Sequence, residues 1–205
     1  MKGKFIVIDG PDGCGKSTQS KLLTQYLKQK GCKVLALREP GGTRISEKIR
    51  TILLDPKNYK MTEITELFLY MASRSQLVAE LIKPALKSGK IVLCDRFLSS
   101  TIVYQGIAGG VGKKLVETIG KIATENIKPD ITIILDVLPQ EGLNRKKSAP
   151  DRMEKKKLVF HEKVRLGFLS LAKSDSHQYK VIKSYGPIKE VQAKIQQTVS
   201  KLIKS

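Results

Sequence analysis

The stretch FIVIDGPDGCGKST (residues 5–18) joins an apolar, β-branched run to a glycine-rich loop that ends in Gly-Lys-Ser. Its second part, residues 10–17, fits the pattern G-x-x-x-x-G-K-[ST]. It also follows a predicted strand and opens a predicted helix, which is the context that this pattern requires. Glycine lacks a Cβ atom, so such a loop can curl around a phosphate with its N–H groups pointing inward. The stretch therefore predicts a phosphate-binding P-loop.

The side chains of this loop suit a nucleoside triphosphate. Lys16 can reach the terminal phosphates as a point charge, and the positive end of the following helix adds to the attraction. The hydroxyl of Ser17 can enter the octahedral shell of Mg²⁺. The residues expected to contact the nucleotide are Gly10, Pro11, Asp12, Gly13, Cys14, Gly15, Lys16, Ser17 and Thr18.

Around this loop, short apolar runs alternate with longer amphipathic stretches of helical spacing. That alternation predicts an α/β fold of the P-loop NTPase type, a five-stranded parallel sheet with helices on both faces. Four of the runs carry little internal polarity, so we expect these strands to be buried on both faces. A chain of 205 residues fits a single domain spanning residues 1–205. The runs are residues 4–9, 33–38, 90–96, 130–137 and 178–183.

The composition narrows the class of protein. With 40% hydrophobic and 28% charged residues, it is ordinary for a soluble globular domain. No apolar run approaches the roughly 18 residues of a membrane span, and the run before Asp9 is too short for a signal peptide. We therefore expect a cytoplasmic protein that does not bind membranes. The three cysteines are widely spaced and without a CxxC pair, so the sequence indicates neither a disulfide framework nor a zinc site.

The formal net charge of +19 is compatible with nucleic-acid binding or with a phosphate-handling enzyme. The lysines are spread along the chain, and they form no basic arm interleaved with aromatic residues. Nucleic acid is therefore an unlikely ligand.

A second group of polar residues follows the apolar run at residues 90–94. Asp95 and Arg96 stand where a buried strand ends, at the edge where open α/β sheets bind ligands. They could form a simple structural ion pair. Alternatively, Asp95 could hold Mg²⁺ through water, while the guanidinium of Arg96 binds a second phosphate bidentately. Two phosphate-binding elements would imply a donor and an acceptor.

Tyr70 and Arg74 are four residues apart and share one face of a predicted helix. An apolar stripe with one arginine is the ordinary interpretation. The same pair could also stack on a nucleobase and donate to its carbonyl oxygen.

In this order and spacing, the motifs resemble the thymidylate kinase family, in its bacterial type with an acidic P-loop residue and a basic lid. The resemblance runs from end to end and implies transfer of the γ-phosphoryl group of ATP to dTMP with Mg²⁺ present. The products would be dTDP and ADP, in dTTP biosynthesis, and the family is typically homodimeric. The stretches that carry the resemblance are REPGGTRISEKIRTILLD (38–55), ASR (72–74), DRFLSSTIVYQG (95–106) and KPDITIILDV (128–137).

The resemblance also implies roles for single residues. Arg50 and Arg96 would hold the dTMP phosphate, Tyr70 would stack on thymine, and Arg74 would donate to its O4 edge. The positions that would close around the base and sugar are Ser100, Thr101, Tyr104 and Gln105. The residues with an implied catalytic role are Asp12, Lys16, Asp95, Arg96, Arg145 and Arg152, with Ser17 and Asp95 on the metal and Asp12 also near the substrate.

The basic segment at residues 144–157 contains Pro150 and small residues that break a helix, so it is expected to be a mobile, solvated loop. Some family members have an arginine directly after the P-loop acid, but this chain has Gly13. The resemblance then implies that a lid at about residues 144–154 supplies the missing charge and excludes water when it closes. The candidates are Arg145, Lys146, Lys147 and Arg152, of which Arg145 and Arg152 are favoured.

Two departures from the family pattern are conservative: Asp9 replaces the commoner glutamate, and Phe97 replaces tyrosine after Asp-Arg. Cys14 is interpreted as a small filler in the loop. The nearest alternative function is a kinase for another nucleoside monophosphate or a nucleoside. A basic ATPase stimulated by nucleic acid and a non-catalytic nucleotide-binding module are further alternatives. A GTPase is disfavoured because the chain has no N-K-x-D motif.

Overall fold

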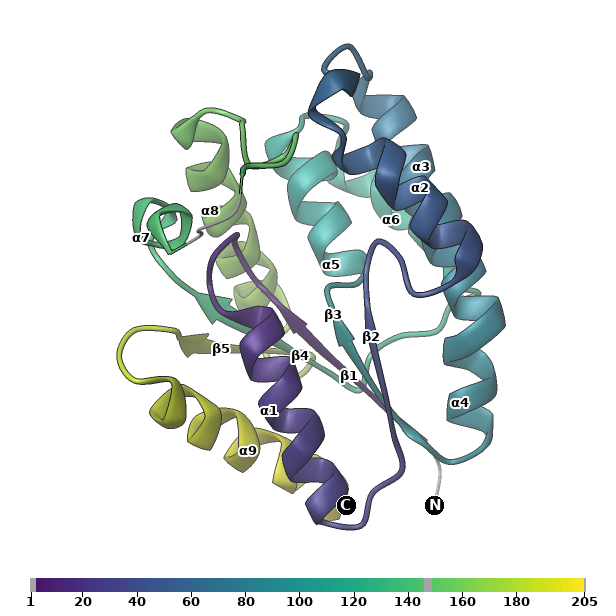
Figure 1. Cartoon of the computed structure of the whole chain (residues 1–205), viewed down its shortest axis with the longest axis vertical. Coiled ribbons are helices and arrows are strands. Elements are labelled where there is room, and N and C mark those ends of the chain that lie inside the picture. The colour runs from purple at the N-terminus through teal and green to yellow at the C-terminus, as the bar shows by residue number, and fades with distance from the viewer. Residues whose placement is uncertain (1–2, 146–148, 205) are drawn as a thin grey trace.

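A computed structural model describes residues 3–145 and 149–204 of the chain. One parallel sheet runs through the molecule in the strand order β2-β3-β1-β4-β5 (Figure 1). All five predicted runs form strands, so the predicted fold class is confirmed. The strands are β1 (Lys4–Asp9), β2 (Val34–Arg38), β3 (Ile91–Asp95), β4 (Ile131–Asp136) and β5 (Tyr179–Lys183).

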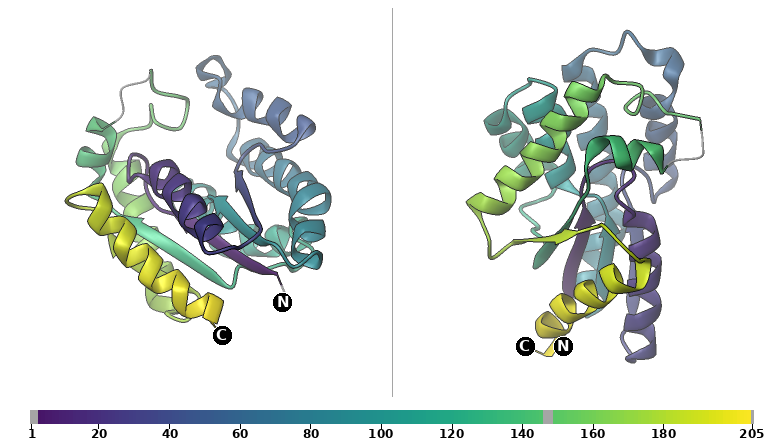
Figure 2. Two further views of the ribbon diagram at one scale, coloured as in Figure 1. Left: turned by 60° about the horizontal axis from the view of Figure 1, so that its bottom comes forward. Right: turned by 90° about the vertical axis from the view of Figure 1, so that its left-hand side faces the viewer.

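Helices cover both faces of this sheet, and the two ends of the chain lie at the same end of the molecule (Figures 1 and 2). In the described parts of the chain, no helix combines the length and the apolar character needed to span a bilayer. Short π-helical segments, Val78–Ile82 and Ile102–Ala108, extend α3 and α5, and a 3₁₀ turn at Pro56–Asn58 follows α2. The helices are α1 (Lys16–Gln29), α2 (Arg44–Leu54), α3 (Glu63–Leu77), α4 (Lys83–Lys87), α5 (Leu98–Thr101), α6 (Lys113–Ala123), α7 (Pro139–Asn144), α8 (Leu158–Ser174) and α9 (Ile188–Lys204).

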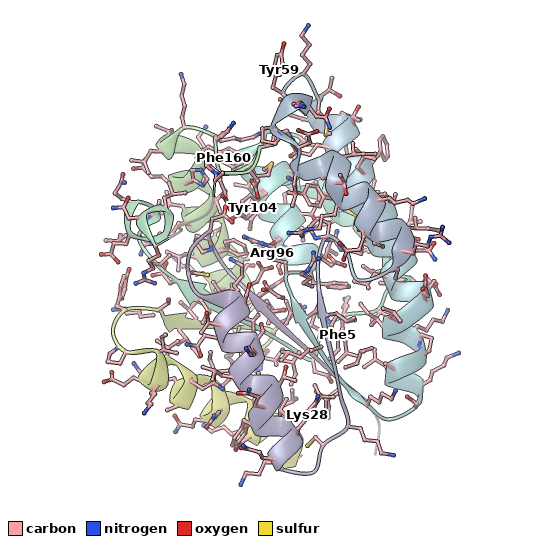
Figure 3. All side chains as sticks on the ribbon, viewed as in Figure 1. Phe5, Lys28, Tyr59, Arg96, Tyr104 and Phe160 are labelled. Carbon is pink, nitrogen blue, oxygen red and sulfur yellow. The ribbon has the colours of Figure 1, made fainter. Side chains whose placement is uncertain are left out.

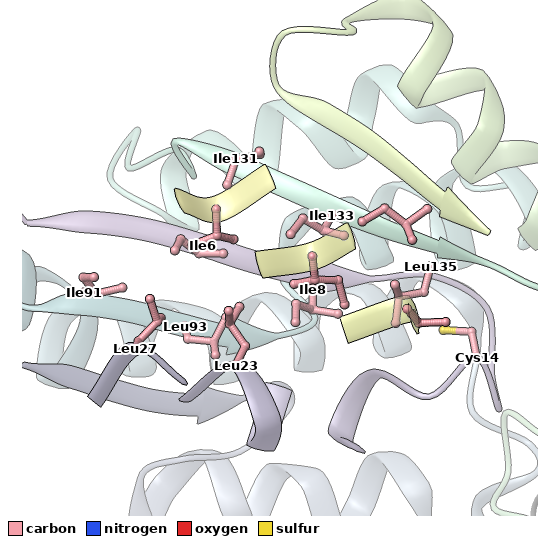
Figure 4. Close-up of a cluster of buried hydrophobic side chains, with 14 of the residues drawn as sticks. Ile6, Ile8, Cys14, Leu23, Leu27, Ile91, Leu93, Ile131, Ile133 and Leu135 are labelled. Atoms are coloured by element: carbon pink, nitrogen blue, oxygen red, sulfur yellow. The ribbon is translucent and has the colours of Figure 1, made fainter. Parts of the chain in front are cut away.

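Alternation along β1 explains how the sheet is covered on both sides. Ile6 and Ile8 point into a core cluster with α1 and α9, part of which Figure 4 shows. Phe5 and Val7 point the other way, into a cluster with α3 and the segments that follow it. Because successive side chains of a strand lie on opposite faces, a strand buried on both sides must be apolar throughout. This central burial fixes the carboxyl end of β1, from which the P-loop starts.

The expectation of four doubly buried strands is correct for only three of them. β1, β3 and β4 are buried along nearly their whole length. β2 lies at one edge of the sheet, where Ala36 and Arg38 are exposed, and β5 lies at the other edge, where only Ile182 is buried. An apolar run does not reveal whether its strand has one neighbour or two, because that depends on strand order.

Part of the basic segment before α8 is not solvated: among its described residues, 144–145 and 149–157, Arg152 and Met153 are buried, whereas residues 144, 145, 149 and 150 are exposed. It forms turns in which Met153 is 5% exposed and joins the core cluster of α3, α6 and α8. The burial of Met153 and its neighbour Arg152 corrects the expectation that this part of the segment is solvated.

A matched pair of substitutions in α8 tests the core. Leu171 is 4% exposed and Leu166 is 62% exposed. Leu171→Ala should lower the free energy of unfolding by about 2–5 kcal/mol, because it leaves a cavity against the sheet. Leu166→Ala should change it by less than about 0.5 kcal/mol. Urea unfolding at one protein concentration measures both, and equal losses would contradict the packing described.

Candidate active site

The carboxyl end of the sheet opens into a cleft of about 710 Å³, lined by the P-loop, the ends of β2 and β3, and residues of α2, α3 and α5. Both groups of residues that the sequence singled out therefore face one cavity, as open α/β sheets favour. The predicted site residues on its wall are Asp12, Gly13, Cys14, Gly15, Lys16, Ser17, Thr18, Arg50, Tyr70, Arg74, Asp95, Arg96, Ser100, Thr101, Tyr104, Gln105 and Arg145.

The P-loop is shaped before any nucleotide arrives. Gly13 has a φ of +71°, and a Cβ atom there would lie 1.7 Å from the carbonyl oxygen of Gly142 in α7. Only glycine fits this position. The Lys16 ammonium group curls back over the loop and donates to the carbonyl oxygens of Gly10 at 3.1 Å and Pro11 at 2.7 Å. Lys16 is thus held at the place where phosphates would replace these carbonyls.

A hydroxyl group and a carboxylate meet beside the P-loop. Ser17, in the first turn of α1, donates from Oγ to Oδ2 of Asp95 at 2.7 Å. Asp95 ends β3, so the neighbouring strands β1 and β3 bring together residues far apart in sequence. A serine hydroxyl and a carboxylate are the hard oxygen ligands that Mg²⁺ prefers, so this pair fits such an ion.

Arg96 links the P-loop to the opposite wall of the cleft. Its Nη2 atom donates to Oδ1 of Asp12 at 2.5 Å, and its Nη1 atom donates to Oγ of Ser100 at 2.9 Å. The guanidinium carbon lies 5.0 Å from the centre of the Tyr104 ring, and Figure 3 shows these two side chains next to each other. The backbone of Arg96 has a φ of +69°, a conformation rare outside glycine that occurs often at functional sites.

Tyr104 completes the surroundings of the P-loop acid. Its hydroxyl donates to Oδ2 of Asp12 at 2.8 Å. Burial holds the pKa of Tyr104 well above its usual value, so the hydroxyl keeps the proton that it donates. Both oxygens of Asp12 are therefore fixed by side chains from the segment after β3.

Asp9 is a structural acid whose importance the sequence did not reveal. It is fully buried and accepts hydrogen bonds from Oγ of Ser99 at 2.5 Å and Oγ of Ser100 at 2.6 Å. It also accepts from the backbone N–H of Gly10 at 2.9 Å. Asp9 thus ties α5 to the start of the P-loop. The sequence signals that could have predicted these contacts are an acid at the end of one strand and a Ser-Ser pair after the neighbouring strand.

On the wall of the cleft that α2 and α3 form, Arg74 is 2% exposed and is held by a partner that the sequence analysis missed. Its Nη2 atom lies 2.6 Å from Oε2 of Glu39 and donates to Oγ1 of Thr101 at 3.0 Å. Arg50 lies nearby in α2 and donates to the carbonyl oxygen of Pro40 at 2.8 Å. Glu39 stands within the quoted REPGGT stretch, but only the folded chain shows which arginine it pairs with.

The two favoured lid arginines lie in different places. Arg145 lines the cleft and donates from Nη1 and Nη2 to the carbonyl oxygen of Ser184, each at 3.2 Å. Ser184 in turn donates from Oγ to the carbonyl oxygen of Cys14 at 2.6 Å, so Arg145 sits next to the P-loop.

Arg152 is not on the wall of the cleft, which corrects its expected place at the transferring phosphate. Its side chain is 8% exposed, and Nη1 lies 2.5 Å from Oε2 of Glu66 in α3. Lys146 and Lys147, the other lid candidates, lie outside the described residues.

Comparison with known proteins agrees with this geometry. The family model described as Thymidylate kinase matches residues 8–195. The chain belongs to the thymidylate kinase family. Membership of this family makes it a phosphotransferase of the nucleoside monophosphate kinase class.

Individual thymidylate kinases resemble the chain over nearly its full length. A Thermoanaerobacter sp. (strain X514) thymidylate kinase is 46% identical over 204 residues, which cover 99% of this chain and 100% of the relative. A Chlamydia abortus thymidylate kinase is 44% identical over 97% of this chain and 96% of its own. The crystal structure of thymidylate kinase from Ehrlichia chaffeensis superposes with a TM-score of 0.81 at 32% identity, covering 97% of this chain and 100% of that one.

The cysteines give a test of the site's packing. Cys14 in the P-loop is 1% exposed, and burial raises the pKa of its thiol despite the nearby Lys16. Burial also raises the pKa of Cys94 well above its usual value. A raised pKa means less thiolate at a given pH, so both should resist a thiol reagent at pH 8. We expect only the partly buried Cys32 to react quickly in the native protein, with all three reacting after unfolding in urea.

Proposed function

We propose that this chain transfers the γ-phosphoryl group of ATP to dTMP, giving dTDP and ADP for the synthesis of dTTP. The proposal rests mainly on one observation. The P-loop and an acceptor region rich in arginine face one cleft, joined by the pairs Ser17–Asp95 and Asp12–Arg96. A nucleotide-binding module without catalysis would not need the arginine-rich acceptor region. Family membership supports both the donor and the acceptor.

At the donor end, we assign the triphosphate to the P-loop, residues 10–18, with the backbone N–H groups of residues 13–18 and the ammonium group of Lys16 as donors. Ser17 and Asp95 would hold Mg²⁺, whose chemistry when bound is to neutralise charge between the β- and γ-phosphates. Lys16 already lies beside the loop carbonyls, so it needs only a short movement to reach a phosphate oxygen. These groups position the donor and require no proton transfer of their own.

At the acceptor end, we assign the dTMP phosphate to Arg50 and Arg96 and the thymine ring to Tyr70, with Arg74 donating to its O4 edge. The acceptor phosphate is already anionic, so the main barrier lies in aligning two anions. The burial of Arg74 supports this assignment, because its guanidinium is fixed before the base arrives. The remaining side chains proposed around the base and sugar are Asp12, Ser100, Thr101, Tyr104 and Gln105.

Gly13 follows the P-loop acid, so the charge on the transferring group must be met from another residue. We assign that role to Arg145, whose guanidinium group lies beside Ser184 on the wall of the cleft. Its hydrogen-bond acceptor is a neutral backbone carbonyl, and its one ion pair among the described residues is an exposed contact of 4.0 Å with Glu141, so a phosphate oxygen would outcompete both as a partner. We further propose that the lid at about residues 144–154 closes at its first residues, which would bring Arg145 over the phosphates and exclude water while Arg152 stays bound to α2 and Glu66.

We also propose that the protein acts as a homodimer, in the cytoplasm. Large apolar side chains are exposed on α2, α3 and α6, which pack side by side. Exposed apolar side chains that gather on neighbouring helices are typical of an interaction site. Its residues are Ile45, Ile52, Ile64, Phe68, Leu115 and Ile122.

Arg96→Ala tests the proposed reaction. The variant removes the guanidinium group that meets Asp12 and the proposed acceptor phosphate, so ADP release with ATP and dTMP should fall by about 100-fold to 1,000-fold. Arg44→Ala, an exposed position in α2, is the control and should keep wild-type activity. A thermal unfolding curve for each variant shows that the loss is not due to misfolding. Near wild-type turnover by folded Arg96→Ala would contradict the acceptor site, and equal wild-type rates with dTMP and dAMP would contradict the acceptor itself.

The dimer is tested by adding charge to the apolar surface. Phe68 in α3 is 55% exposed, and Phe68→Asp should halve the mass measured by analytical ultracentrifugation. Leu166→Asp, on α8 and 62% exposed, should leave the mass unchanged. A monomeric wild-type protein would refute the proposal.

A further inference from the structure

Glu66, in the first turn of α3, is a buried acid to which neither the sequence analysis nor the proposed reaction gives a task. It is 4% exposed and uses its two carboxylate oxygens for different partners. Oε1 accepts a hydrogen bond from Nε2 of Gln105 at 2.7 Å. Oε2 forms an ion pair with Nη1 of Arg152 at 2.5 Å. Glu66 therefore connects the turn before α8 with the segment that follows β3.

The ion pair behind Glu66 is itself anchored. Arg152 donates from Nε to the carbonyl oxygen of Leu53 at 2.8 Å, and its backbone N–H donates to the carbonyl oxygen of Leu54 at 3.3 Å. Both carbonyls belong to the last turn of α2, where helical carbonyls lack intrahelical partners. Arg152 thus fixes the carboxylate of Glu66 against a rigid element, and Glu66 has little freedom to rotate.

The bond to Gln105 determines which end of that amide reaches the cleft. An amide side chain carries a donor end and an acceptor end of almost the same shape. Because the paired carboxylate of Glu66 can only accept, it binds the nitrogen of Gln105 and leaves the oxygen as the other end. Gln105 is 2% exposed and contributes to the wall of the cleft, within the π-helical segment that also carries Tyr104.

We propose that Glu66 is a positioning residue for base choice, which it controls by holding the amide oxygen of Gln105 toward the acceptor base. The inference rests on the proposed function, because it requires a pyrimidine nucleotide in this cleft. The ring nitrogen N3 of thymine carries a hydrogen and can donate to that oxygen. N3 of cytosine carries none, so it would face the oxygen with a lone pair. Sites that pair with a specific donor reject analogues that lack it, because their own polar group is left unpaired.

Glu66→Gln tests this role with almost no change in shape. The substituted amide can donate as well as accept, so it allows Gln105 to present either its oxygen or its nitrogen to the cleft. kcat/KM for dTMP should fall about tenfold, mainly through KM, while kcat/KM for dCMP should stay level or rise. The preference for dTMP over dCMP should therefore drop by about tenfold or more, with the KM for ATP unchanged. Glu63→Gln, exposed one turn earlier on the same helix, is the matched control and should keep the wild-type preference.

The outcomes separate this inference from the proposed function. A wild-type protein that does not turn over dTMP overturns both. An active wild type whose preference is unchanged in Glu66→Gln, or a variant that loses dTMP and dCMP turnover by the same factor, overturns the role of Glu66 alone. If Glu66→Gln does not fold because Arg152 loses its partner, the double variant Glu66→Gln/Arg152→Met removes the buried charge and is measured in the same way.

Discussion

The contact on which the site depends most is the one between Arg96 and Asp12, 2.5 Å apart across the cleft. It joins the P-loop to the segment after β3, so the donor and acceptor ends of the cleft cannot move independently. Asp9 supports the same junction from below, because it binds Ser99 and Ser100 and is itself at the end of β1. The side chain of Arg96 points back across the P-loop, and its backbone adopts a strained left-handed conformation. A parallel sheet makes this junction possible, because β1 and β3 are neighbours and end at the same edge.

The sequence predicted the strands, the P-loop and most of the cleft wall because these features are encoded locally. A run of β-branched residues, or a glycine spacing, carries its meaning within about ten residues. The partners that hold the site were not predictable in this way. Glu39 and Arg74 are 35 positions apart, and Ser99 lies 90 positions from Asp9. Which buried acid meets which donor is decided by strand order and helix packing, and the sequence of one chain does not state these pairings.

Arg152 shows why a charge pattern alone misleads. A basic segment next to a phosphate site suggests that each of its cations seeks the phosphate. In the structure, Asp151, Met153 and Glu154 lie on the wall of the cleft, but the guanidinium group of Arg152 points to Glu66 instead. Burial of a guanidinium without a partner would be costly, and the buried carboxylate of Glu66 supplies that partner. The guanidinium group of Arg145, in contrast, donates to the carbonyl oxygen of Ser184 on the wall of the cleft.

The cations of the cleft differ in what holds them, and this difference assigns their tasks. Lys16 and Arg145 donate hydrogen bonds to neutral backbone carbonyls, which are weaker acceptors than phosphate oxygens, and the Glu141 carboxylate beside Arg145 is exposed and 4.0 Å away. They can exchange partners when a triphosphate arrives and move with the transferring group. Arg74 is bound by the carboxylate of Glu39, a partner that a neutral base cannot displace. In the proposed reaction, Arg74 would therefore serve as a fixed donor that shapes the site, whereas Lys16 and Arg145 would serve as mobile charges. A cleft that must align two anions needs both kinds of cation. Rigid cations set the geometry, and cations that can exchange partners move with the charge of the transferring phosphoryl group.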